Sequence, residues 1–128
     1  MTPSAEIKVM VVDDYEAMRM LICRCLNDLG FMNVRLKASA EEALAALRAE
    51  RFDLIISDYQ MGSVDGMQLL RTVREDPEMA ETKFIMLTGS ADRELVREAV
   101  ALGCEYVTKP VEPRALKATI TRLLTAAD

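Results

Sequence analysis

Residues 54–58 read LIISD, a short apolar run that ends in a carboxylate. Residues 9–14 repeat the pattern, because VMVV is followed directly by Asp13 and Asp14. A third apolar run, KFIML, occupies residues 83–87. Short runs that are apolar on both faces are typical of the central strands of a parallel sheet, which helices cover on both sides. We therefore predict strands at 7–12, 54–57 and 83–87.

Helical periodicity fills the segments between these runs. Apolar residues recur at steps of three and four from 18 to 29, and Gly30 then suits the position just past a helix end. Ser39 and Glu42 match the capping box that opens a helix. Further helices are predicted around 67–73, around 95–102 and from Pro113 onward. The alternation predicts βα units in series, with helices on both faces of the sheet.

Two weaker strands decide the order of the predicted sheet. Residues 33–37 alternate between polar and apolar, and the strand at 106–108 is short, so both are expected at the edges. The predicted order is 2-1-3-4-5, one of the common doubly wound arrangements. The fold class is therefore α/β: a doubly wound, five-stranded parallel sheet of the flavodoxin-like (βα)5 kind. We expect a single domain over 1–128, with its core at about 7–125.

Composition narrows the classes of function. Of 128 residues 51% are hydrophobic, but no apolar run reaches the length of about 20 that a membrane span needs. We expect no membrane insertion, a cytoplasmic location and a monomer. The net charge of −5 and the scattered basic residues argue against direct nucleic-acid binding. The absence of histidine excludes a Ser-His-Asp triad and His-ligated zinc. The three cysteines are interpreted as buried, reduced thiols and the nine methionines as core filler.

Polar residues gather where the predicted strands end: Asp13, Asp14, Asp58, Thr88 and Lys109. In an open parallel sheet, ligands bind beyond the carboxyl ends of the strands, at the point where the strand order reverses. Two carboxylates about 5 Å apart repel by about 3 kcal/mol at an effective dielectric constant near 20, and one lysine does not offset three such pairs. Either some carboxyl groups stay protonated or a hard cation such as Mg²⁺ binds. A carboxylate could then act as the nucleophile toward a phosphoryl donor.

Four motifs, in this order, resemble the receiver domain of two-component response regulators, most closely the single-domain chemotaxis regulators of the CheY type: VVDD at 11–14, LIISD at 54–58, MLTG at 86–89 and YVTKP at 106–110. The resemblance implies that Asp58 is the phosphoacceptor. It also implies that Mg²⁺ or Mn²⁺ binds to the side chains of Asp13, Asp14 and Asp58 and to the main-chain carbonyl of Gln60.

The resemblance further implies how the phosphoryl group is sensed. Lys109, followed by a cis bond to Pro110, would contact that group, and Thr88 would donate a hydrogen bond to one of its oxygens. Tyr106 would then rotate inward and reshape the surface of the fourth helix, fifth strand and fifth helix. Such a protein is a switch rather than a turnover enzyme. Its partners would be a sensor histidine kinase or a histidine phosphotransfer protein and a downstream target such as the flagellar motor switch.

Three residues depart from the family pattern, and two others occupy positions that affect the lifetime of the phosphoryl group in the family. Gly62 stands where proline is usual, Gly89 where alanine is common, and Val111 where a larger aromatic residue is frequent. Gln60 and Ser90 occupy positions that tune the lifetime of the phosphoryl group in the family.

Other interpretations stay open at this point. The chain could be a phosphate sink, a phosphorelay intermediate, a regulator of a kinase, or a receiver fragment of a DNA-binding regulator. A flavodoxin-type cofactor binder has the same strand order, but Asp13 and Asp14 would repel a flavin phosphate, which needs a cradle of N–H and hydroxyl donors.

Overall fold

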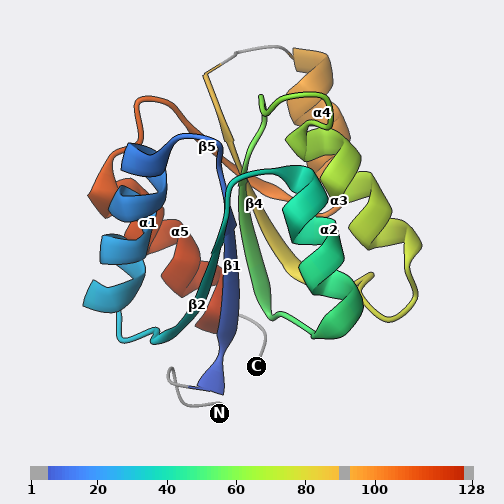
Figure 1. Ribbon diagram of the computed structural model, residues 1–128. Coiled ribbons are helices and arrows are strands. Elements are labelled where there is room, and N and C mark those ends of the chain that lie inside the picture. Colours follow the sequence, from blue (N-terminus) through green and yellow to red (C-terminus); the bar gives the residue numbers. More distant parts are fainter. Residues whose placement is uncertain (1–5, 90–92, 126–128) are drawn as a thin grey trace.

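The computed structural model describes residues 6–89 and 93–125, which form a five-stranded parallel sheet flanked by helices (Figure 1). The strands lie in the order β2-β1-β3-β4-β5, so the predicted fold class and strand order are confirmed. Within the described residues, no helix combines the length and apolar character needed to cross a bilayer. The elements are β1 (Lys8–Val12), α1 (Glu16–Asp28), β2 (Asn33–Lys37), α2 (Ala40–Ala49), β3 (Leu54–Asp58), α3 (Gly66–Glu75), β4 (Lys83–Thr88), α4 (Arg93–Ala101), β5 (Glu105–Thr108) and α5 (Pro113–Thr125).

The central strands extend slightly further than the sequence pattern predicts. β3 includes Asp58, which pairs with Leu87 of β4, and β4 includes Thr88, which pairs with Thr108 of β5. Two polar residues that were expected to follow the strands are therefore part of the sheet itself. Because ladder hydrogen bonds hold their backbone, their side chains project from rigid positions rather than from loops.

The helices cover the sheet in two groups. α1 and α5 lie on one face, and α2, α3 and α4 lie on the other (Figure 1). The core beneath α1 and α5 consists mainly of leucine and β-branched side chains. The core on the other face contains five buried methionines: Met10, Met61, Met67, Met79 and Met86.

The interpretation of all methionines as core filler is wrong for two of them. Met20 and Met32 are 59% and 71% exposed. Single apolar side chains are common on protein surfaces, because the chain has too little polar surface to cover the whole molecule. The three cysteines are free thiols, as expected, and Cys25 and Cys104 are buried, but the expectation of burial is wrong for Cys23, which is only partly buried.

Side-chain caps set where α2 and α3 begin. The Ser39 hydroxyl accepts a hydrogen bond from the Glu42 backbone N–H at 3.1 Å, and the Glu42 carboxylate accepts from Ala38 N–H rather than from Ser39. The predicted cap of Ser39 is thus present, but the hydrogen bond that Glu42 accepts comes from the N–H of Ala38, one residue before the predicted donor Ser39. α3 has a complete capping box, because Asp65 and Gln68 each accept from the other's backbone N–H. This second box fixes the start of α3 just after the loop that leaves β3.

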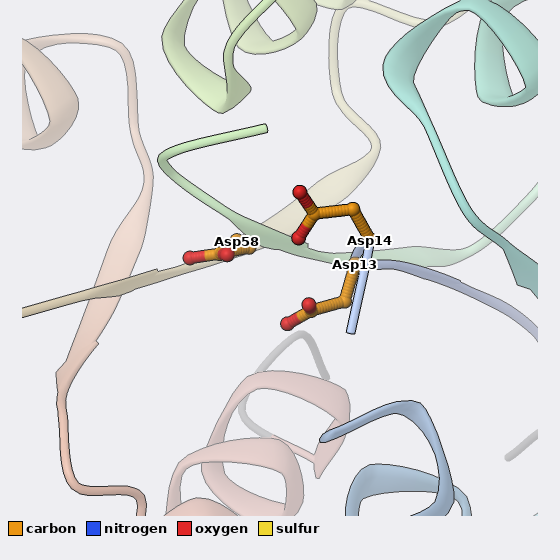
Figure 2. Close-up of side chains that lie close together, drawn as sticks. All are labelled: Asp13, Asp14 and Asp58. Atoms are coloured by element: carbon orange, nitrogen blue, oxygen red, sulfur yellow. The ribbon is translucent and has the colours of Figure 1, made fainter. Parts of the chain in front are cut away.

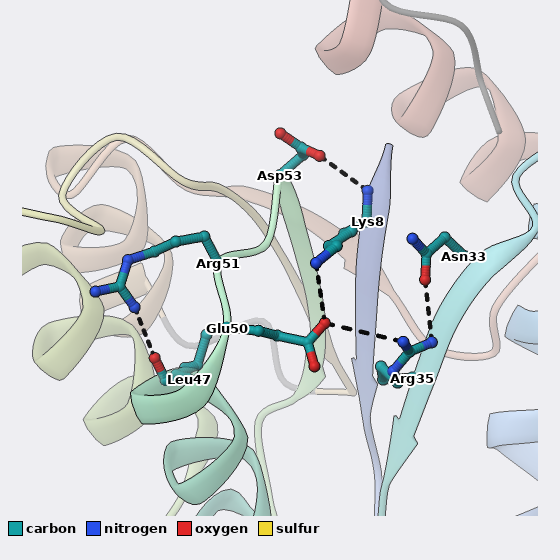
Figure 3. A network of polar contacts seen from close by, with 7 residues as sticks. All are labelled: Lys8, Asn33, Arg35, Leu47, Glu50, Arg51 and Asp53. Carbon is teal, nitrogen blue, oxygen red and sulfur yellow. Dashed lines mark hydrogen bonds and ion pairs between the residues drawn. The ribbon is translucent and has the colours of Figure 1, made fainter. Parts of the chain in front are cut away.

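A polar network ties the chain together at the amino-terminal edge of the sheet (Figure 3). The Lys8 backbone N–H donates to Asp53 Oδ2 at 2.8 Å, and Lys8 Nζ lies 3.3 Å from Glu50 Oε1. Arg35 from β2 reaches the same Glu50 oxygen at 3.9 Å, and Arg51 Nη1 donates to Leu47 O at 2.9 Å. Exposed ion pairs of this kind each contribute little, about 0–1 kcal/mol. Their role is to join neighbouring segments at the edge opposite the acidic residues.

Candidate functional site

Three carboxylates converge at the carboxyl ends of β1 and β3. Asp13 and Asp14 follow β1 directly, and Asp58 is the last residue of β3, the strand beside β1 (Figure 2). One oxygen from each side chain lies within 4.8 Å of the others. The structure thus brings together the three acidic residues that the sequence pattern placed at this edge. In the part of the chain that the structure describes, these three aspartates form the one group of three or more Asp, Glu, Cys or His side chains that are close enough to hold a metal ion together.

Asp13 is the buried member of this group. It is 1% exposed, and its Oδ1 accepts a hydrogen bond from the Tyr15 backbone N–H at 2.9 Å. Its Oδ2 is buried and has no hydrogen-bond partner. The pKa of Asp13 is raised to about 6, mainly by burial and to a lesser extent by the negative charges of Asp58 and Asp14, while the hydrogen bond from the Tyr15 N–H and the charge of Lys109 oppose the increase. An unpartnered buried carboxylate oxygen facing two other acids fits a proton or a hard cation.

Lys109 supplies the positive charge at the site. Its Nζ lies 2.7 Å from Asp58 Oδ1, and the Asp58 residue is only 5% exposed. The Lys109 backbone N–H donates to Thr88 O at 2.9 Å, which anchors the segment after β5 to the end of β4. The Lys109–Pro110 peptide bond is cis, as the family resemblance implied.

Two hollows flank the Asp58–Lys109 pair. The first, of about 260 Å³, is lined by Asp13, Asp14, Tyr15, Met18, Asp58 and Lys109. The second, of about 320 Å³, is lined by Asp58, Tyr59, Gln60, Thr88, Gly89 and Lys109. The pair of Asp58 and Lys109 contributes to both walls. Small charged groups can therefore reach the Asp58 carboxylate from either side.

The remaining predicted residues differ in whether they line a hollow beside Asp58. Gln60 is exposed and lines the second hollow, and Thr88 is 2% exposed and lines the same hollow. Tyr106 is 42% exposed on β5, beside Met86 of β4, and lines neither hollow. Ser90 lies outside the described residues. Gly62 has a φ of +43°, which proline cannot adopt, so this loop follows a path that the family's usual proline would forbid.

Gly66 is a site-forming residue that the sequence analysis did not single out. A Cβ atom added there would lie 2.3 Å from Asp58 O and 2.7 Å from Met86 Sδ. The Gly66 N–H also donates to Tyr59 O at 2.8 Å, which closes the loop after β3. Only glycine allows α3 to begin this close to Asp58. The sequence signal that could have located this helix start is the spacing of Asp65 and Gln68, which matches a capping box and makes Gly66 the first residue of α3.

Comparisons with known proteins agree with this geometry. Residues 9–121 match the family described as response regulator receiver domain. Over 118 residues the chain is 35% identical to the chemotaxis protein CheY of Pseudomonas aeruginosa, covering 91% of this chain and 95% of that protein. It is 32% identical to the chemotaxis protein CheY-3 of Vibrio cholerae, covering 91% of each. The solved structure of Vibrio cholerae chemotaxis protein CheY4 has a TM-score of 0.83 at 34% identity, covering 91% of this chain and 98% of that chain.

The matched region begins in β1 and ends in α5, so it contains every strand and the whole acidic site. The relatives are nearly the same length as the matched part of this chain. On these grounds the chain belongs to the response regulator receiver domain family, the CheY-type regulators of two-component signalling.

Proposed function

We infer that this chain is a phosphorylation-driven switch in which Asp58 accepts a phosphoryl group. The observation that carries the proposal is the placement of the Asp58 carboxylate. It projects from a rigid strand end, lies 2.7 Å from Lys109 Nζ, and borders both hollows. A nucleophile held on a central strand beside a fixed cation meets the positioning requirement of phosphoryl transfer, which depends on orientation and charge stabilisation.

The proposed reaction is a displacement at phosphorus. An Asp58 carboxylate oxygen donates an electron pair to form the O–P bond, while the P–N bond of a phosphohistidine donor breaks. The electron pair of the broken bond leaves with the donor's imidazole, which takes up a proton. Lys109 stabilises the charge on the transferring oxygens. These 128 residues contain no histidine, so the phosphohistidine lies outside them; the proposed donor is a sensor histidine kinase, a histidine phosphotransfer protein or a small phosphodonor.

Asp13, Asp14 and Asp58, together with the main-chain carbonyl of Gln60, are proposed to hold Mg²⁺ or Mn²⁺. The fit rests on the three converging carboxylates and on the unpartnered Oδ2 of Asp13. When bound, such an ion neutralises the acids and the incoming phosphoryl oxygens. Asp13 has to release its proton to serve as a ligand, so cation binding is expected to weaken as the pH falls below about 6.

We propose that Thr88 and Tyr106 transmit the modification. Thr88 is buried at the end of β4 and lines a hollow together with Asp58, which supports a hydrogen bond from its hydroxyl to a phosphoryl oxygen. Tyr106 is exposed on the neighbouring strand, and Val100 of α4 is 57% exposed. An inward rotation of Tyr106 would remove an aromatic side chain from the α4–β5–α5 surface. The output is then a changed affinity for a downstream protein.

Labelling of the intact protein tests the acceptor assignment. The protein is incubated with acetyl phosphate and Mg²⁺, and the added phosphoryl group is detected by intact-mass spectrometry. The wild type is expected to gain one phosphoryl group in Mg²⁺ and none in EDTA, and Asp58→Asn should gain none. Asp53→Asn is the matched control, because Asp53 precedes the same strand at the opposite edge of the sheet. Labelling of Asp58→Asn equal to the wild type would refute the assignment.

The downstream partner is the finer question. The similarity to chemotaxis proteins favours a motor-type target, whereas a phosphate sink, a relay intermediate, a kinase regulator or a fragment of a DNA-binding regulator would use the same site. Capture experiments with phosphorylated protein and with Asp58→Asn protein separate these alternatives. A target bound only by the phosphorylated form supports the switch, and a second phosphotransfer protein that receives the group from Asp58 supports a relay.

A further inference from the structure

The polar atoms of Asp13 are held by three different parts of the chain. The backbone N–H donates to Lys37 O of β2 at 3.0 Å, and Oδ1 accepts from the Tyr15 N–H at 2.9 Å. The backbone carbonyl accepts from Arg19 Nη1 at 2.6 Å. The fourth atom, Oδ2, is buried and has no hydrogen-bond partner. Hydrogen bonds thus fix three of the four polar atoms of Asp13, whose carboxylate belongs to the acidic cluster.

Arg19 is the only side chain among these three donors. It lies in the first turns of α1, is partly buried, and reaches back over the turn that joins β1 to α1. The carbonyl it binds belongs to the peptide that links Asp13 to Asp14. A buried carbonyl needs a donor, and here a charged guanidinium provides a short bond to it. The orientation of this one peptide determines where both neighbouring carboxylates point.

Metal sites depend on such supporting contacts. Mg²⁺ requires near-ideal octahedral geometry with short ligand distances, so small rotations of a ligand are costly. Groups that orient the ligands without touching the ion affect affinity by about 10- to 100-fold when they are removed. The partner atoms in the other two hydrogen bonds are the backbone atoms Lys37 O and Tyr15 N, so they do not depend on the side chains of those two residues. The Arg19 bond is the one that sequence can change.

We propose that Arg19 is a positioning residue of the cation site: it holds the Asp13–Asp14 peptide so that both carboxylates face Asp58. This inference rests on the proposed function, since it concerns the cation bound by the same acids. Arg19 is expected to contribute through geometry, with its guanidinium on the carbonyl rather than on the ion.

The test measures cation affinity directly, using Mg²⁺ alone in calorimetric titrations of the full chain at neutral pH. Arg19→Met removes the donor and keeps the length of the side chain, and it is expected to weaken Mg²⁺ binding by about 10- to 100-fold. Arg19→Lys keeps a donor of similar reach and should recover part of that loss. Arg24→Met is the matched control, because Arg24 is an exposed arginine further along the same helix. It should bind Mg²⁺ like the wild type.

A second measurement separates positioning from general stability. Urea unfolding in EDTA reports the stability of each variant without the ion, and the gain on adding Mg²⁺ reports the ion's binding. The proposal expects the Mg²⁺-dependent gain to fall in Arg19→Met and to return in part in Arg19→Lys. If Arg19→Met loses stability in EDTA but binds Mg²⁺ like the wild type, Arg19 is a structural clip and the inference is wrong.

The outcomes also separate the two proposals. If the wild type itself fails to bind Mg²⁺, the cation part of the proposed function fails and this inference falls with it. If the wild type binds and both Arg19 variants bind equally well, only the inference fails. Should Arg19→Met not fold, Arg19→Lys and Arg19→Gln decide together. The shorter side chain of Arg19→Gln cannot reach the carbonyl, so tighter Mg²⁺ binding by Arg19→Lys than by Arg19→Gln would support the proposal. Equal affinity in these two variants would overturn it.

Discussion

Replacing Asp13 by asparagine is expected to stabilise the metal-free protein at neutral pH. Asp13 is 1% exposed, and its pKa is raised from 3.8 to about 6, mainly by burial and partly by the charges of Asp58 and Asp14. Asparagine has nearly the same shape, carries no charge, and can still accept the hydrogen bond from the Tyr15 N–H. The substitution therefore removes the cost of a buried charge while leaving the local packing in place.

The magnitude and its pH dependence follow from the pKa. One pKa unit corresponds to about 1.4 kcal/mol, so the ionised Asp13 side chain costs the native state up to about 3 kcal/mol at neutral pH. Because the folded pKa lies above the unfolded value, the stability contributed by the protonated carboxyl is fully present below pH 3.8. It is lost as the pH rises through about 6. The advantage of Asp13→Asn should be near zero around pH 3.8 and reach about 3 kcal/mol, or roughly 10 °C in Tm, at neutral pH.

Urea unfolding followed by far-UV circular dichroism, in EDTA at the two pH values, measures this difference. Asp14→Asn is the control, because Asp14 belongs to the same cluster but is exposed, and its substitution should change stability much less. Added Mg²⁺ should reduce the difference in stability between Asp13→Asn and the wild type, because the wild type gains about 1.4 kcal/mol when the ion is at ten times its Kd. The reasoning is refuted if Asp13→Asn is no more stable at neutral pH, or if its advantage is the same at both pH values.

Three further outcomes are expected. Lys109→Met should slow labelling of Asp58 by acetyl phosphate by about 100-fold or more, because it removes the cation 2.7 Å from the carboxylate, while Lys117→Met should label normally in a mass-spectrometric time course. Gly66→Ala should destabilise the protein by about 1–3 kcal/mol in urea unfolding, because its Cβ would lie 2.3 Å from Asp58 O. Gly89→Ala is the control and should be nearly neutral, because a Cβ at Gly89 would lie 3.9 Å from Lys109 Cβ, the nearest atom in the described part of the chain. Arg74→Met should lower the free energy of unfolding by about 2–4 kcal/mol, because the partly buried Arg74 donates to Leu102 O at 2.6 Å and to Thr82 O at 2.7 Å. Arg71→Met should lower it by less than about 1 kcal/mol, because Arg71 is exposed and pairs with Glu98. Equal losses of stability for the two variants in thermal unfolding would contradict this.

Several features of the fold were predictable from short stretches of sequence. The order of the strands follows from burial: the central strand at 54–58 is buried at every position, whereas the edge strand at 33–37 has no fully buried residue. Gly30 was expected just past a helix end, and it has a φ of +91° there. Helix starts were less accurate, since the complete capping box at Asp65 was missed although its residues are spaced as the motif requires.

The residues of the acidic site were also visible in the sequence, and for a simple reason. Parallel strands all end at one edge, so polar residues that directly follow several apolar runs must come close together once the strand order is known. Asp13, Asp14, Asp58 and Lys109 meet this condition, and the structure brings them together. Their chemical roles stay predictions until labelling and cation binding are measured.

Tertiary structure alone decided the environment of each site residue. Whether a carboxylate is solvated depends on atoms from other elements, so the sequence could not distinguish buried Asp13 from its exposed neighbour Asp14. The contact of Arg19 with the Asp13 carbonyl and the closeness of Gly66 to Asp58 O likewise require coordinates. The amino-acid sequence determined which residues share an edge of the sheet, because hydrophobic burial sets the strand order. Packing determined which of them lost water, and desolvation is what raises the pKa of Asp13 and makes the site suited to a cation.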